Sequence, residues 1–199
     1  MVVALGCPTL LALEEVDTAS TLAGGEDDVL PELIADLAAQ GCGYASANSH
    51  PDTGDHGVAV LWRTDQLTDA SWTTEYQGCS AVGSTSSSYD TFCDGEPGLY
   101  PLFSRRPVVV TATPTAACTG GAAHPVTLIG AHLKAKTDGA PGDQRRLEQA
   151  IFLSDLVDTL SAGGAARVVV AGDLNDLEDS PALVALSGDG DLDSAWGAV

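Results

Sequence analysis

The sequence RVVVAGDLND at residues 167–176 decides how this chain is interpreted. Three consecutive valines that end at a glycine are typical of a β-strand, because β-branched side chains pack well in sheets. The polar segment that follows contains Asp173 and Asn175. An apolar strand that ends in an acid and an amide indicates a sheet with a functional site along its rim.

Two other apolar runs end in side chains that suit chemistry. Residues 9–13 (TLLAL) precede Glu14 and Glu15, and residues 126–132 (VTLIGAH) end in His132. Because strand ends in stacked sheets converge on a common rim, we expect these groups to gather around one divalent ion. Mg²⁺ takes one or two carboxylates and leaves its other positions to water and phosphate, so Glu15 and Asp173 are the predicted ligands. Mn²⁺ and Ca²⁺ are the alternatives.

Such a set of side chains predicts phosphoester hydrolysis. The metal would polarise the phosphoryl group and steady the leaving oxygen. Asp173 would orient or deprotonate the attacking water, with Asn175 fixing its geometry. His132 would stabilise the charge that develops on the phosphoryl oxygens.

Hydrophobic patterns elsewhere predict an α+β fold. Apolar residues recur at helical spacing over residues 27–40 and 143–160, and a short helix is expected from Ser180 or Pro181. Strands are expected at residues 57–63 (GVAVLWR) and 107–113 (PVVVTAT), both rich in β-branched residues. Contiguous apolar strands that outnumber the helices favour stacked sheets covered by helices.

Composition limits the possible partners. The 199 residues and 44% hydrophobic content suit a single globular domain over residues 1–199. With 28 acidic and 8 basic residues, the net charge of −20 disfavours a broad cationic surface for nucleic acid. The two lysines, Lys134 and Lys136, both lie close to His132. We therefore expect a small, local phosphate site that includes Lys134.

The five cysteines contain no CxxC pair or zinc-type spacing, so disulfides are the favoured prediction. Cys79 and Cys93 bracket a loop rich in Gly, Ser and Thr, which we interpret as an insertion at about residues 78–98. We expect these two to pair, the alternative being two unpaired loop thiols. An odd count leaves one thiol over, and Cys7 is the candidate.

Several motifs, in order, resemble the endonuclease/exonuclease/phosphatase superfamily. LLALEEVD resembles the strand with the metal-binding glutamate, which assigns that role to Glu15, and GVAVLWR resembles the second core strand. FSRRPVVV resembles the arginine-bearing strand of the deoxyribonucleases, which places a phosphate contact on Arg105. His56 falls where the family has a polar residue near the cleft, although a surface histidine that caps the strand is an equal alternative.

GAHLKAK and VVVAGDLND resemble the family's histidine-bearing strand and its GDFN-type signature, so His132, Asp173 and Asn175 inherit active-site roles. DQRRLEQA resembles the helix between those two motifs in bacterial members. The resemblance implies two stacked, mainly antiparallel sheets flanked by helices, a four-layer sandwich that is incomplete here. The family's asparagine-bearing first strand and its closing SDH-like motif are not found, so we expect a chain truncated at both ends with reduced activity.

The resemblance implies a metal-dependent phosphodiester hydrolase, first of all a secreted nuclease that acts on DNA or RNA. An inositol-phosphate or sphingomyelin phosphoesterase and a non-catalytic remnant of the same fold are the alternatives. Lipid substrates rank lower because no segment supplies an exposed apolar hairpin. The expected location is extracellular or periplasmic, with an export signal upstream of Met1, no transmembrane segment and no obligate protein partner.

Overall fold

The computed structural model describes residues 2, 4, 6–16, 29–49, 56–83, 92–165, 167–188 and 192–193. It divides into two compact units. Unit 1 comprises Met1–Tyr76, Arg105–His132 and Ala165–Gly172. Unit 2 comprises Gln77–Ser104, Leu133–Gly164 and Asp173–Val199. Each unit is described separately below.

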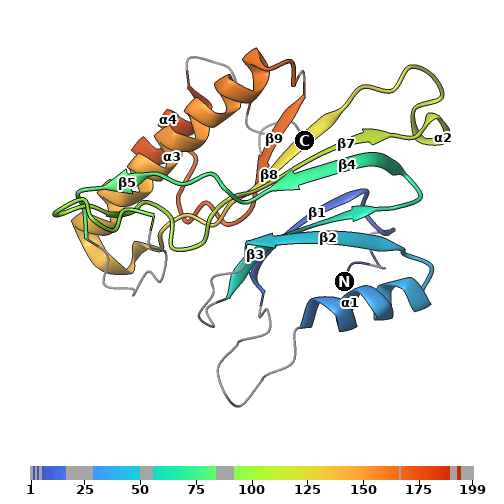
Figure 1. Ribbon diagram of the computed structural model, residues 1–199, viewed down its shortest axis with the longest axis horizontal. Helices are drawn as coiled ribbons and strands as arrows, with labels where there is room; N and C mark the ends of the chain where they lie inside the picture. Colours follow the sequence, from blue (N-terminus) through green and yellow to red (C-terminus); the bar gives the residue numbers. More distant parts are fainter. Residues whose placement is uncertain are drawn as a thin grey trace. The chain divides into compact units, whose positions relative to one another are not determined.

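Unit 1 contains two β-sheets. The first has the order β1-β3-β2 and is antiparallel throughout, with β1 at Leu10–Val16, β2 at Tyr44–Ser49 and β3 at Gly57–Arg63. Helix α1 (Val29–Ala39) packs on this sheet through Leu30 and Leu37 (Figure 1). The central strand β3 is buried along its whole length, as its apolar sequence predicts.

The second sheet of unit 1 has the order β4-β7-β8-β9. Its strands are β4 (Leu67–Thr73), β7 (Val108–Pro114), β8 (Val126–Gly130) and β9 (Val168–Ala171), and the short helix α2 (Ala116–Thr119) follows β7. The pairs β4/β7 and β7/β8 are antiparallel, whereas β8 and β9 are parallel with Gly130 opposite Ala171. The paired ends of β8 and β9 are followed in the chain by His132 and Asp173, respectively.

The two sheets stack through one hydrophobic cluster. Its members come from both sheets: Ala47, Val58, Val60, Trp62, Leu67, Val108, Val110, Ala112 and Leu128. Side chains alternate along each strand, so β3 contributes every second residue to this cluster. The opposite face of β3 packs toward α1 through Ala59 and Leu61. Unit 1 is thus a β-sandwich with a helix on one outer face.

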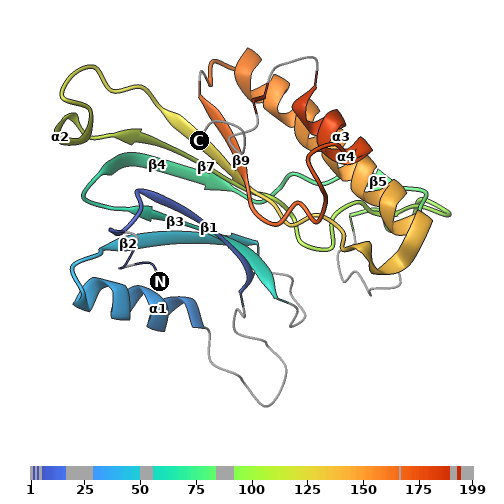
Figure 2. The same cartoon turned by 180° about the vertical axis from the view of Figure 1, so that it is seen from behind.

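Unit 2 is built around a long helix. It contains β5 (Cys79–Ser80), β6 (Tyr100–Pro101), the 3₁₀ turn η2 (Lys136–Asp138), α3 (Gly139–Ala162) and α4 (Pro181–Ser187). Helices α3 and α4 pack side by side (Figure 2). The start of α4 is fixed by Ser180, whose side chain accepts a hydrogen bond from the backbone of Leu183, and by Pro181 in the first turn.

Buried polar side chains of α3 hold the loop segments of unit 2. Arg145 is 2% exposed and donates to the carbonyl oxygens of Val82, Pro101 and Leu102. Gln149 also donates to Leu102, at 2.9 Å. Burial lowers the pKa of Arg145. These contacts organise backbone that β5 and β6 alone are too short to order.

The structure confirms the α+β class and the stacked sheets, with differences at the element ends. Strand β1 continues through Glu14 and Glu15 to Val16, so the two acids lie within the strand and not beyond it. Helix α3 begins at Gly139, four residues before the expected start at Asp143. Among the described helices, none has the length and apolarity needed to cross a bilayer.

The cysteine predictions are half right. Cys79 and Cys93 form the expected disulfide. The prediction that Cys7 is unpaired is wrong, because it forms a disulfide with Cys42, and the free thiol is the exposed Cys118. Helix α1 returns the chain to the start of the first sheet, which brings Cys42 beside Cys7. The two cysteines are separated by 35 positions in the sequence and are brought together only by the tertiary structure. Cysteine spacing alone therefore does not reveal this pair.

Removing the Cys79–Cys93 disulfide is expected to destabilise unit 2. A cross-link closing a loop of this length lowers the entropy of the unfolded chain, so the double Cys→Ser variant should lose about 3 kcal/mol of unfolding free energy. Urea unfolding followed by circular dichroism measures the loss. Cys118→Ser, at an exposed free thiol, is the control and should stay within about 0.5 kcal/mol of the unmodified chain.

Candidate functional site

The predicted site residues fall in both units. Unit 1 holds Glu15, His56, Arg105 and His132, and unit 2 holds Lys134, Asp173 and Asn175. The chain passes from unit 1 to unit 2 directly after His132 and again directly after Gly172. Each half of the predicted set can therefore be described within its own unit.

Strand β1 has a β-bulge at its two adjacent glutamates, Glu14 and Glu15. The register with β3 shifts between Leu13 and Val16, and Glu15 has a φ of 54°. A bulge inserts an extra residue into one strand and re-aims its side chains. Glu15 is exposed, whereas the Glu14 side chain is only 16% exposed. Glu15 therefore faces solvent, where the predicted role as a metal ligand is feasible.

His132 lies beside Glu14. Its Nδ1 atom is 3.9 Å from Oε2 of Glu14, and its side chain is 6% exposed. Two strands bring these groups together, because Glu14 lies in β1 and His132 follows β8 by two residues. The acid that the structure places beside His132 is therefore Glu14, to which the sequence assigned no role.

Gly172 closes one side of the Glu14 carboxylate. It has a φ of 139°, and a Cβ atom at this position would overlap both the carbonyl oxygen of Ala131 and Oε1 of Glu14. Ala131 in turn donates from its backbone N–H to the carbonyl of Ala171 at 3.0 Å. Only glycine permits the end of β9 to approach so closely.

Gly172→Ala is expected to destabilise unit 1 and to displace Glu14. The strained backbone and the overlap should together cost about 3 kcal/mol of unfolding free energy, measured by urea unfolding. Gly121→Ala is the matched control, because a Cβ there meets no atom within 4 Å. Equal losses in the two variants would show that the close approach at Gly172 does not exist in solution.

His56 and Arg105 are brought together in unit 1. The Nε atom of Arg105 donates a hydrogen bond to the backbone carbonyl of His56, just before β3. The neighbouring Arg106 lies 3.5 Å from Glu75 in an exposed ion pair. The side chain of Arg105 is thus anchored through Nε, and Nη1 and Nη2 lie outside this hydrogen bond.

Asp173 and Asn175 form a compact turn in unit 2. Asp173 is exposed, and its Oδ1 accepts a hydrogen bond from the backbone N–H of Asn175 at 2.8 Å. The side-chain amide of Asn175 donates to the carbonyl of Leu133 at 2.9 Å, and Leu133 donates to the carbonyl of Asp173 at 3.0 Å. Asn175 has a φ of 52°, a conformation that asparagine tolerates better than most residues. Asn175 therefore fixes the turn that presents Asp173.

Lys134 is already engaged by an acid. Its Nζ atom lies 2.9 Å from Oδ2 of Asp138, and the side chain is 12% exposed. A phosphate contact by Lys134 would have to share the ammonium with Asp138. Lys136 is 51% exposed and is bound to Asp176 at 2.7 Å.

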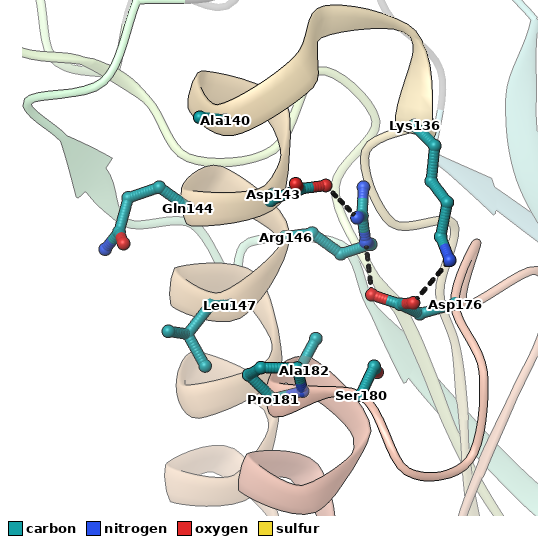
Figure 3. Close-up of a pocket in the computed structure, with 10 residues that line it drawn as sticks. All are labelled: Lys136, Ala140, Asp143, Gln144, Arg146, Leu147, Asp176, Ser180, Pro181 and Ala182. Atoms are coloured by element: carbon teal, nitrogen blue, oxygen red, sulfur yellow. Dashed lines mark hydrogen bonds and ion pairs between the residues drawn. The ribbon is translucent and has the colours of Figure 1, made fainter.

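A pocket in unit 2 of about 470 Å³ is lined by the start of α3, the start of α4 and the segment that bears Asp176 (Figure 3). Asp176 is 9% exposed and lies between Lys136, at 2.7 Å, and Arg146, at 2.8 Å. Arg146 also binds Asp143 at 2.5 Å. Burial alone would raise the pKa of Asp176, but hydrogen bonds from Lys136 and Arg146 hold it far below its ordinary value.

The donors in the predicted set suit a hard cation. Carboxylate and amide oxygens are the ligands that Mg²⁺ prefers, and Glu15 and Asp173 both have exposed carboxylates. Within the described part of the chain, no cluster of three or more His, Cys, Asp or Glu side chains is arranged to hold a metal ion. One or two carboxylates are sufficient for Mg²⁺, because water and substrate supply its other ligands.

The stacked sheets agree with the comparison of sequences. A sequence model described as the Endonuclease/Exonuclease/phosphatase family matches residues 8–198. The chain therefore belongs to this family. A search of curated proteins finds no match.

Several solved structures have a similar fold. Sphingomyelinase C from Streptomyces griseocarneus has a TM-score of 0.55 and 16% identity, covering 94% of this chain and 58% of its own. The human nocturnin catalytic domain, solved with bound sulfate, has a TM-score of 0.52 and 15% identity. The match covers 95% of this chain and 59% of the nocturnin chain. ANGEL2, a 2′,3′-cyclic phosphatase, has a TM-score of 0.51 and 17% identity. The match covers 92% of this chain and 44% of the ANGEL2 chain. The chain thus spans about three fifths or less of these structures.

Proposed function

We propose that this chain is part of a metal-dependent phosphodiester hydrolase, with nucleic acid as its substrate. One observation carries the proposal: within a family of phosphoester-cleaving enzymes, His132 and Asp173 each follow a strand of the parallel pair β8/β9 by two residues. The parallel register in unit 1 places Gly130 opposite Ala171, which are the last residues of those strands.

The proposed roles follow from what each side chain can do. Glu15 and Asp173 would hold Mg²⁺, which when bound polarises the phosphoryl group and steadies the leaving oxygen. Asp173 is exposed, so its free carboxylate oxygen can orient or deprotonate a water molecule. Asn175 keeps Asp173 in place through the turn, and His132 donates a hydrogen bond to the phosphoryl oxygens.

Recognition of the substrate is expected to be local. A net charge of −20 repels a polyanion over most of the surface, so cationic groups near the site must supply the attraction. Arg105 is the best candidate, because its side chain is anchored through Nε and not by an ion pair that the structure describes. Lys134 is a weaker candidate because Asp138 binds its ammonium group.

Two disulfides favour an oxidising compartment. Cys7–Cys42 and Cys79–Cys93 would be reduced in most cytosolic environments. We therefore propose that the protein acts outside the cytosol, in the extracellular space or the periplasm.

The experiment combines metal binding with a substrate panel. The protein is titrated with Mn²⁺ and followed by electron paramagnetic resonance, which reports binding without any turnover. It is then incubated with plasmid DNA, bis-p-nitrophenyl phosphate, an inositol phosphate and sphingomyelin, with Mg²⁺ or with EDTA. We expect Mn²⁺ binding, and hydrolysis of DNA and of the model diester only when metal is present.

Each other outcome has a defined meaning. Preferred cleavage of the inositol phosphate or of sphingomyelin would contradict the nucleic acid assignment while keeping the phosphoesterase chemistry. Failure to bind Mn²⁺ together with no hydrolysis would contradict the proposed function and favour a non-catalytic member of the family. Activity that persists in EDTA would contradict the metal-dependent mechanism.

A further inference from the structure

Glu14 is a buried acid for which the proposed hydrolysis has no direct use. It lies in β1 next to the proposed metal ligand Glu15, yet the two side chains have different environments. Glu15 is exposed, whereas both carboxylate oxygens of Glu14 are inaccessible to solvent. Burying a carboxylate is costly unless polar or charged groups compensate it. The position of Glu14 therefore requires an explanation.

The imidazole of His132 provides one. Its Nδ1 atom faces Oε2 of Glu14 at 3.9 Å, and the two side chains are 6% and 16% exposed. On another side, a Cβ atom added to Gly172 would overlap Oε1 of Glu14 and the backbone oxygen of Ala131. The carboxylate is thus confined between β1 and the segments that follow β8 and β9.

We infer that Glu14 is a positioning residue for His132. A carboxylate facing Nδ1 favours the tautomer that carries its proton on Nδ1 and fixes the ring orientation. The Nε2 atom is then the one directed away from Glu14. This inference rests on the proposed function, because it assigns to His132 a defined face toward the phosphoryl group.

The alternation of side chains and the bulge in β1 together give the two adjacent glutamates different positions. In a regular strand, successive side chains point to opposite faces, and one of them would face the core. Alternation from Leu10, which packs in the cluster between the sheets, places Glu14 on the same side. The register shift between Leu13 and Val16 leaves Glu15 in solvent while Val16 packs in the cluster beneath α1. One strand thereby supplies both a proposed metal ligand and a residue that orients the imidazole.

The test uses a variant series and a direct view of the histidine ring. Glu14→Met keeps the side-chain length but removes the carboxylate that faces Nδ1, whereas Glu14→Gln keeps an oxygen there. Side-chain ¹⁵N NMR spectra report the tautomer of His132, with its signals identified by their loss in His132→Ala. Glu15→Gln is the control, since it should weaken Mn²⁺ binding without moving the His132 signals.

We expect the His132 signals to show a protonated Nδ1 in the unmodified protein and to lose this preference in Glu14→Met. The value of kcat for the model diester should fall about 10- to 100-fold with KM within about twofold, and Glu14→Gln should recover part of the loss. A merely structural role would not produce this split or this recovery.

Two results would overturn the inference. One is an unchanged His132 spectrum in Glu14→Met, and the other is a changed spectrum with unchanged kcat. The NMR readout needs neither metal nor substrate, so it separates this inference from the proposed function. If the unmodified protein neither binds Mn²⁺ nor cleaves the diester while the spectrum still depends on Glu14, the positioning contact is supported and the proposed function fails.

Discussion

Replacing Asp173 by asparagine is expected to lower kcat/KM for a phosphodiester by about 100- to 10,000-fold, the usual contribution of a general acid or base. The substitution removes the negative charge but keeps an oxygen at Oδ1. That oxygen can still accept the hydrogen bond from the backbone of Asn175, so the turn should persist. The loss would therefore report on chemistry and not on folding. Initial rates with bis-p-nitrophenyl phosphate measure it.

Two companion variants make this result interpretable. Asp173→Ala removes both the charge and the turn contact, so it should lower the activity at least as far and also reduce stability. Asp179→Asn removes an exposed charge from the same segment and should leave the activity within twofold, since Asp179 has no proposed role. Equal activity of Asp173→Asn and the unmodified protein would exclude Asp173 from the reaction.

The sequence predicted the parts of the fold that have strong periodicity. The strand at Gly57–Arg63 is matched residue for residue, because every position is buried and the segment is apolar throughout. Helix α1 is matched by its spacing of leucines. Strand β4 has no prediction, because its sequence LTDASWT is polar and most of it is exposed at a sheet edge. Strand β2 was missed because YASANS consists largely of small and polar residues.

The residues of the proposed site also divide into those that the local sequence indicates and those that depend on the fold. Asp173 and Asn175 could be proposed from the sequence because a run of valines leads directly to them, and the turn that joins them is local. Glu14 could not be assigned, because its contact with His132 joins β1 to the end of β8, which lies far away in the sequence. Strict alternation would predict only that Glu14 and Glu15 point to opposite faces.

The two arginines of α3 have partners that only the fold brings together. Arg145 and Arg146 are both buried. Arg146 does bind the acids Asp143 and Asp176, whereas Arg145 binds backbone carbonyls. Sequence spacing on a helix reveals the Asp143 contact, three residues away. It cannot reveal Asp176, which follows β9.

Asp176→Asn is expected to cost about 3 kcal/mol of unfolding free energy at pH 7, since removing one partner of a buried ion pair leaves the other charge uncompensated. Asp176 accepts from Lys136 through Oδ1 and from Arg146 through Oδ2. Asparagine offers one oxygen, so its amide group would face a cationic donor. Asp143→Asn is the matched control: Asp143 also binds Arg146 but is 63% exposed, so its loss should cost less than about 1 kcal/mol.

The pH dependence of this difference gives an independent check. Hydrogen bonds from Lys136 and Arg146 hold the pKa of Asp176 below its value in the unfolded chain, which is about 4. A group with a depressed pKa in the folded state contributes its stability above the unfolded value, and that contribution is lost as the pH falls through the folded value. The gap between the unmodified protein and Asp176→Asn should therefore be constant near neutral pH and narrow below about pH 4. A gap that is independent of pH down to acid unfolding would mean that packing of the carboxyl group, and not its charge, stabilises the start of α3.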